Sequence, residues 1–104
     1  MDGDQRKEKG VSVHKALAHN RGDHVAVAVA PITAGEHISV AYLDDDGEQP
    51  LDARTDVPYG HKIALASLEP GVPVLEYSTQ VAVTRVAIDA GAHVHTHNVK
   101  TARW

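Results

Sequence analysis

The amino-acid sequence predicts a small all-β domain of barrel type, and three observations carry this prediction. The chain has 104 residues, enough for one domain with one modest core. Its apolar residues are mostly Val, Ala, Leu and Ile, with no Phe, one Trp and three Tyr, a set that suits thin sheets and tight barrels better than helical bundles. Short apolar segments recur at even spacing between Gly and Pro, and no segment carries a helical stripe of useful length.

The chain is expected to begin with a leader and to continue as one folded domain. Residues 1–14 are largely polar and charged, so we expect a disordered leader there and a folded domain over residues 15–104. In residues 25–30, Val alternates with Ala, which predicts a strand with two apolar faces, one lined by the smaller side chain. Further strands are expected over residues 37–43, 61–67, 72–77, 80–88 and 93–99. The predicted core residues are Val25, Val27, Val29, Ile38, Val40, Ile63, Leu65, Val74, Val81, Val83 and Val94.

Residues 44–56 are rich in acidic and turn-forming residues and begin with Asp44-Asp45-Asp46-Gly47. Because this stretch lacks apolar anchors, we expect an exposed and mobile loop that folding does not require. Its acidic residues do not match the ligand spacing or the closing Glu of a calcium-binding loop.

Three segments of the sequence share one turn pattern. Residues 32–38, 68–74 and 88–94 each contain an apolar residue, an acidic residue or Thr, a small residue or Pro, a Gly, two variable residues and another apolar residue. The Gly in each segment allows a positive φ, and the flanking apolar residues can enter the core. The pattern indicates pseudo-symmetric strand–turn–strand units.

The composition argues against several classes of partner. The formal net charge is −4 and no basic stripe is present, which argues against nucleic acid and against an anionic membrane surface. No apolar run is long enough to span a bilayer, and the first residues lack the pattern of a signal peptide. With no Cys there is neither a disulfide framework nor thiolate chemistry, so we expect a cytoplasmic protein.

The strongest candidate for chemistry is the run His93-Val94-His95-Thr96-His97-Asn98. If these residues form a strand with Val94 in the core, His93, His95 and His97 share the outer face. The three imidazoles then either are incidental surface residues or serve proton transfer or metal binding. His95 and His97 are capable of ligating a metal, but two imidazoles do not complete a coordination shell, so no metal site is predicted from them.

A second candidate is Tyr59-Gly60-His61-Lys62, where a Gly at a strand entry lets a ligand approach the backbone. In a regular strand His61 and Lys62 point to opposite faces, so we expect only one of them to serve a given site. On spacing alone, a polar strand entry is the preferred interpretation.

The two candidate segments together resemble a known domain. The segment Gly60-His61-Lys62-Ile63-Ala64-Leu65 and the ending Val94-His95-Thr96-His97-Asn98 resemble the SAF-type N-terminal domain of the altronate and galactarate dehydratases. Residues 23–28 are similar to the opening strand of that domain, and the resemblance extends over residues 15–99. It implies a β-clip fold, a small convoluted all-β barrel.

The resemblance also implies a function. In this family the domain precedes a large catalytic domain or forms a separate small subunit beside it, and a related branch is the two-subunit sulfolactate sulfo-lyase, which removes sulfite. We therefore expect a small accessory subunit of a two-part lyase, with a large catalytic dehydratase subunit as partner and an anionic sugar acid such as altronate or galactarate as substrate. Iron or another divalent metal is expected in the assembled enzyme and none in the isolated chain.

Within that interpretation each candidate residue has an expected role. His95 and His97 are the predicted catalytic residues, because a dehydration needs a tunable proton carrier. His61, Lys62 and Asn98 are the predicted substrate-binding residues.

The sequence departs from the family pattern in three places, so the identity of the substrate within its class stays open. The departures are Glu76-Tyr77-Ser78 in place of Lys-Tyr-Gly, Ala92 in place of Glu, and the long acidic stretch. The competing hypothesis is a stand-alone SAF module that binds carbohydrate or protein without catalysis.

Overall fold

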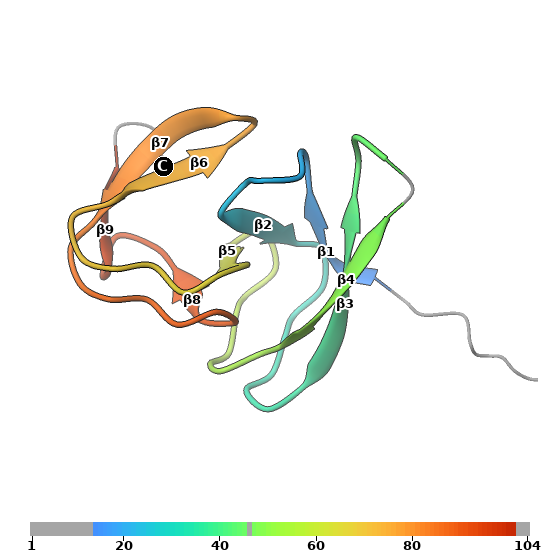
Figure 1. The fold of residues 1–104 in the computed structure, drawn as a ribbon. Coiled ribbons are helices and arrows are strands. Elements are labelled where there is room, and N and C mark those ends of the chain that lie inside the picture. Colours follow the sequence, from blue (N-terminus) through green and yellow to red (C-terminus); the bar gives the residue numbers. More distant parts are fainter. Residues whose placement is uncertain (1–13, 46, 102–104) are drawn as a thin grey trace, which may run out of the picture.

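A computed structural model describes residues 14–45 and 47–101 and contains strands but no helix among them. The fold is all-β, as predicted, and its two curled sheets give the small convoluted barrel expected of a β-clip (Figure 1). The predicted leader lies almost wholly outside the described residues, and the first strand begins at His14. The strands are β1 (His14–Ala18), β2 (Val25–Ala28), β3 (His37–Tyr42), β4 (Glu48–Asp52), β5 (Lys62–Ala64), β6 (Pro73–Glu76), β7 (Thr79–Thr84), β8 (His93–Val94) and β9 (Val99–Thr101).

The strands form a six-stranded and a three-stranded sheet. The order in the larger sheet is β4-β3-β1-β2-β5-β8, with β1 and β3 parallel and the other pairs antiparallel. The smaller sheet, β6-β7-β9, is antiparallel throughout. His24 joins the two sheets, because its amide donates to the Leu75 carbonyl (2.9 Å) and its ring Nδ1 accepts from the Leu75 amide (3.0 Å). In Figure 1, β2 and β5 lie between the small sheet and the β3–β4 end of the large one, and β8 lies below β6 and β7.

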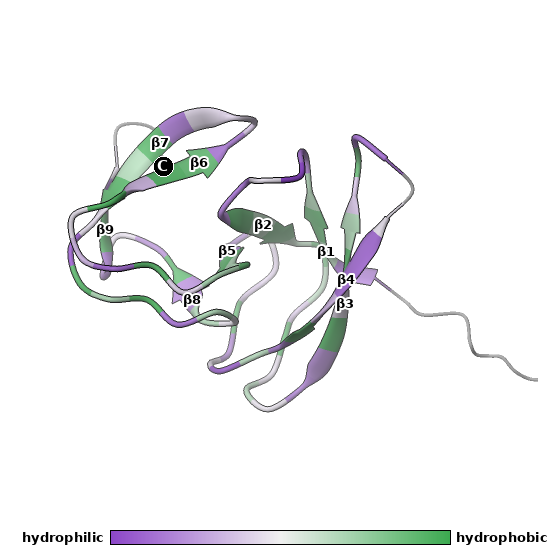
Figure 2. Ribbon diagram, viewed as in Figure 1, coloured by the Kyte–Doolittle hydropathy of each residue, from purple (hydrophilic) through white to green (hydrophobic). Residues whose placement is uncertain are grey.

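Two apolar clusters share the central strands. In β2, Ala26 belongs to the cluster under β1 and β3, while its neighbour Val25 belongs to the cluster facing β6 and β7. In β5, Ile63 and Ala64 divide in the same way. This division follows from alternation along a strand, and it explains why β2 is hydrophobic along its whole length (Figure 2).

The prediction that Val27, Val29 and Val83 are core residues was wrong. Val27 is half-buried, and Val29 and Val83 are 38% and 37% exposed. The buried face of β2 carries its alanines, because the small side chains of β1 and β2 meet there at the pair Ala16–Ala28. In β7 a register shift against β6 between Val74 and Leu75 interrupts the alternation. The other predicted core residues are buried: Val25, Ile38, Val40, Ile63, Leu65, Val74, Val81 and Val94.

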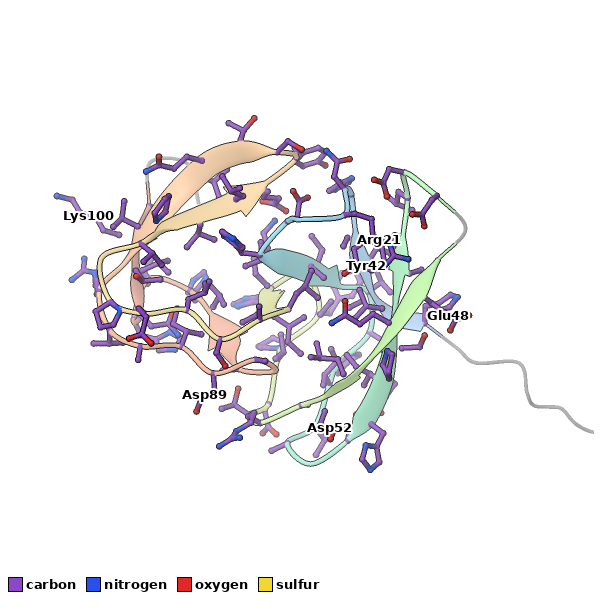
Figure 3. The ribbon with its side chains drawn as sticks, in the orientation of Figure 1. Arg21, Tyr42, Glu48, Asp52, Asp89 and Lys100 are labelled. Atoms are coloured by element: carbon purple, nitrogen blue, oxygen red, sulfur yellow. The ribbon has the colours of Figure 1, made fainter. Side chains whose placement is uncertain are left out.

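The expectation that residues 44–56 form an unanchored loop was also wrong. Residues 48–52 form β4, which pairs with β3 along its whole length, and Leu51 and Ala53 are buried in the first cluster. The sequence pattern did not predict this strand because β4 is largely hydrophilic (Figure 2). Before it, Asp44 and Asp45 accept hydrogen bonds from Arg21, whose guanidinium lies 4.1 Å from the ring centre of Tyr42 (Figure 3).

The repeated turn pattern occurs four times among the described residues, once more than the sequence indicated. Gly35, Gly71 and Gly91 have φ of 88°, 80° and 89°, and Gly60 adds a fourth turn with φ of 83°. The apolar residues that open the turns pair with each other, Ile32 with Val57 and Leu68 with Ile88. The turns at Gly60 and Gly91 lead directly into β5 and β8, so they set those two neighbouring strands side by side.

Candidate functional site

Four histidines gather where β5 and β8 begin, and we call His61, His93, His95 and His97 the histidine cluster. The ring centre of His61 lies 5.0 Å from that of His93 and 4.7 Å from that of His95. The ring of His93 lies 5.6 Å from His95 and 5.2 Å from His97. Ring nitrogens of His61 (Nδ1) and His93 (Nε2) are 2.8 Å apart, which is hydrogen-bond distance.

The pairing of β5 with β8 places His61 beside His93. Ile63 is the pairing partner of His93, and Lys62 is the partner of Val94. Two further hydrogen bonds fix the register, from the Ala64 amide to the Ala92 carbonyl (2.9 Å) and from the Gly91 amide to the Ala64 carbonyl (2.8 Å). The His61 ring therefore reaches the cluster from the turn just before β5.

The expected strand over residues 93–99 was wrong, because β8 ends at Val94 and the chain turns before β9. The buried Asn98 organises this turn. Its Nδ2 donates to the His93 carbonyl (2.8 Å), and its Oδ1 accepts from the His95 amide (3.0 Å). The three imidazoles thus gather through a turn held by Asn98 rather than through strand alternation.

The cluster disfavours protonation of its central ring. Partial burial lowers the pKa of His93 below its ordinary value of 6.5, and the neighbouring rings of His61, His97 and His95 lower it further when they carry charge. At neutral pH His93 is accordingly a neutral imidazole. A neutral ring has one nitrogen that accepts a hydrogen bond or binds a metal.

A hollow of about 210 Å³ adjoins the cluster and is lined by Gly60, His61, Lys62 and His95. The Lys62 ammonium is held there by Glu76, with 2.5 Å between Nζ and Oε2. Both side chains are largely buried, that of Lys62 being 19% exposed and that of Glu76 5%. The expectation that His61 and Lys62 would point to opposite faces was wrong: both line this hollow, because His61 precedes β5 and strand alternation does not govern it.

The structure brings most of the predicted site residues together. His61, Lys62 and His95 line the hollow, and the exposed His97 contacts His93 at the edge of the cluster. Asn98 lies beneath them with its amide bonded to the backbone. His93 was not among the predicted catalytic or substrate-binding residues, although it lies in the same run of alternating histidines as His95 and His97.

The cluster fits a divalent metal ion better than the pair His95 and His97 does. Among the described residues, His61, His93 and His95 each offer a ring nitrogen, and these three atoms lie within 4.8 Å of one another. Neutral imidazoles are common ligands of divalent transition metals. His97 is not part of this set.

A larger hollow of about 470 Å³ lies elsewhere, over β7 and β9, and among the described residues that line it Lys100 alone is ionisable. The described residues contain no helix long and apolar enough to cross a membrane.

These features define a class: a small all-β domain of the β-clip kind whose glycine turns present a histidine-lined surface. The family model for the altronate/galactarate dehydratase SAF domain matches residues 14–102. The chain belongs to this family, and the resemblance drawn from the sequence is confirmed.

Curated relatives fall into two kinds. The chain is 34% identical over 89 residues to the (2R)-sulfolactate sulfo-lyase subunit alpha of Chromohalobacter salexigens, covering 85% of this chain and 95% of the relative. It is 42% identical over 60 residues to the subunit of the same name from Paracoccus pantotrophus, covering 58% of this chain and 90% of the relative. It is also 38% identical over 79 residues to altronate dehydratase of Escherichia coli, covering 76% of this chain but 15% of the relative. The chain is therefore related to a lyase subunit and to one segment of a dehydratase.

Proposed function

We propose that this chain is the small subunit of a two-part lyase and that its histidine cluster forms part of an active site shared with a large catalytic subunit. The observation that carries the proposal is the cluster itself, four imidazoles beside a lysine-containing hollow in a domain of this family. The match over 95% and 90% of two alpha subunits supports the separate-subunit form.

The proposed substrate is an anionic hydroxy acid. A sugar acid such as altronate or galactarate is the first candidate, because the family model bears the names of these dehydratases. (2R)-Sulfolactate is the second candidate, favoured by the two alpha subunits that match over nearly their whole length. Both eliminations remove a proton from carbon and expel a leaving group, so both need a proton carrier and a cationic contact for the carboxylate.

The residues of this chain divide these tasks. His97 is exposed at the edge of the cluster, so we assign it the proton transfer. His95, His61 and Lys62 line the hollow and are assigned to the substrate, with the Lys62 ammonium facing its carboxylate. Asn98 is a positioning residue in this proposal, because its amide holds the backbone of His93 and His95. A divalent metal such as iron, when bound in the assembled enzyme, would polarise a substrate oxygen as a Lewis acid.

The partner subunit is needed to close the site. A hollow of about 210 Å³ is smaller than the roughly 300–1,000 Å³ of typical ligand pockets, and it opens to the surface of a thin domain. In the assembled enzyme the large catalytic subunit therefore supplies the remaining walls of the pocket and excludes water from it.

The test is co-expression of the chain with a candidate large dehydratase-like subunit, sought first among the genes that neighbour its own. We expect the two to co-purify, and we expect turnover of altronate or galactarate, measured as the 2-keto acid, or of (2R)-sulfolactate, measured as sulfite. Neither subunit alone should turn over these acids. Turnover by the isolated small chain, or a large subunit that is fully active without it, would contradict the proposal. Binding of a carbohydrate or protein with no effect on a lyase would support the stand-alone module instead.

A further inference from the structure

The histidine cluster carries an inference about the isolated chain that does not rest on the proposed lyase function. We propose that His61, His93 and His95 together bind one divalent transition-metal ion of the zinc or cobalt type. The sequence led us to expect no metal in the isolated chain, so this proposal departs from that expectation. Of the three ligands, the sequence had indicated His95 as capable of binding a metal, and the structure adds His61 and His93.

The positions of the donor atoms are the first argument. One ring nitrogen from each of the three residues lies within 4.8 Å of the other two. With metal–nitrogen bonds of about 2.0–2.1 Å, ligand atoms around a tetrahedral ion lie roughly 3.4 Å apart, so small side-chain rotations bring the three into place. The pair His61 Nδ1 and His93 Nε2, now 2.8 Å apart, needs to separate by about 0.6 Å to admit an ion.

The rigidity of the supports is the second argument. His61 and His93 are held by the paired strands β5 and β8 and by the backbone bonds between Gly91 and Ala64. His95 is held by the bond from its amide to the Asn98 side chain. Because these supports lie within the folded core, the three ligands are organised before the ion arrives, and little ordering remains to oppose binding.

The chemistry of the surroundings is the third argument. The three ligand rings are only partly buried, so an ion can enter from solvent. Three protein ligands leave at least one position of a tetrahedral ion open, and the hollow lined by His61 and His95 has room for a further ligand. Imidazole nitrogen as the sole protein ligand favours Zn²⁺, Co²⁺ or a related ion over Ca²⁺ or Mg²⁺, which prefer oxygen.

The experiment uses the untagged chain, freed of metal with EDTA and then of EDTA. Co²⁺ binding is followed by its visible absorption and Zn²⁺ binding by titration calorimetry. We expect one ion per chain and a melting temperature that rises with Zn²⁺. Ca²⁺ and Mg²⁺ should produce neither effect. The substitutions His61→Ala, His93→Ala and His95→Ala should each weaken binding by about 100-fold or more, since even a partner outside the first coordination shell is worth roughly 10–100-fold.

Two control variants separate this site from other histidines. His37 lies on β3, and its exposed imidazole pairs with Asp52 of β4. His37→Ala removes this imidazole and should leave the affinity for the metal ion within about twofold of wild type. His97→Ala removes the cluster member outside the ligand set, and the ion should still bind. Circular dichroism of each variant establishes folding, and His95→Asn serves in place of any alanine variant that does not fold. Absence of saturable Co²⁺ and Zn²⁺ binding, or unchanged affinity in the His61, His93 and His95 variants, would overturn the assignment. Because these measurements use the isolated chain, they fail or succeed independently of lyase activity.

Discussion

The ring nitrogens Nδ1 of His61 and Nε2 of His93 lie 2.8 Å apart, although 32 positions separate the two residues in the sequence. Antiparallel pairing of β5 with β8 brings them together, and two glycine turns place those strands side by side. The site therefore depends on the fold of the whole domain, and variants that disturb its supports should disturb the site.

Asn98→Ala should loosen the turn that carries His95 and His97. The change removes both side-chain bonds to the backbone of residues 93 and 95 and leaves two partly buried groups unpaired, so we expect a loss of about 1–3 kcal/mol of stability. Urea denaturation measures this loss, and hydrogen exchange at the His95 amide should accelerate. Asn20→Ala, which removes an exposed bond to Ser78, is the control and should cost less. Equal losses in the two variants would contradict the role given to Asn98.

Lys62→Met should weaken substrate binding in the assembled enzyme more than it slows turnover. A hydrogen bond to a charged group is worth about 1.5–3 kcal/mol, so we expect KM to rise about 10–100-fold while kcat changes less. Lys62→Arg keeps the positive charge beside Glu76 and should restore part of the binding. Lys100→Met, on the β7–β9 face, is the control (Figure 3). An unchanged KM in Lys62→Met would remove Lys62 from the substrate site.

Leu51→Ala should show that β4 belongs to the fold. Leu51 is 8% exposed and lies in the first apolar cluster, so its truncation should cost about 2–5 kcal/mol. Leu43→Ala, at a side chain 56% exposed, should change stability by no more than about 0.5 kcal/mol. Chemical denaturation of both variants gives the comparison. A small effect at Leu51 would restore the interpretation of residues 44–56 as a dispensable loop.

Ser78→Gly should stabilise the hairpin between β6 and β7. Tyr77 and Ser78 have φ of 57° and 59°, a conformation that costs a residue with a side chain about 1–2 kcal/mol. The buried Asp23 holds this turn by accepting hydrogen bonds from both amides, at 2.9 and 3.0 Å. Glycine relieves the strain and loses only an exposed bond to Asn20, so we expect a gain of roughly 0.5–1 kcal/mol. Ser67→Gly, where φ is not positive, should destabilise instead; a melting temperature lowered by Ser78→Gly would contradict the account.

The sequence predicts the fold class because alternation and glycine turns are local signals. Local signals fail where pairing between distant segments decides the outcome: β4 is hydrophilic and becomes a strand because β3 offers it an edge, with Leu51 as its anchor. They also fail at Val83, where the register shift between β6 and β7 interrupts the alternation.

The candidate site likewise has features that local sequence signals predict and features that only contacts between distant residues determine. The alternating histidines are visible in the sequence, and their resemblance to a known domain indicates His61 and Lys62 as well. The approach of His61 to His93 is not visible, because it depends on the pairing of β5 with β8 across 32 positions. The turn at residues 95–98 is likewise set by the buried amide of Asn98 rather than by any periodicity.

If the histidine cluster serves an active site shared with a large subunit, its loss must show in the kcat of the assembled enzyme carrying His97→Ala. A proton carrier contributes typically about 10²–10⁴-fold, so kcat should fall by about 10²-fold or more while the two subunits still co-purify and the small chain remains folded. His37→Ala, an exposed histidine outside the cluster, should keep wild-type kcat. If His97→Ala and His95→Ala both retain the kcat and KM of the wild type, the cluster has no part in catalysis and the claim is wrong.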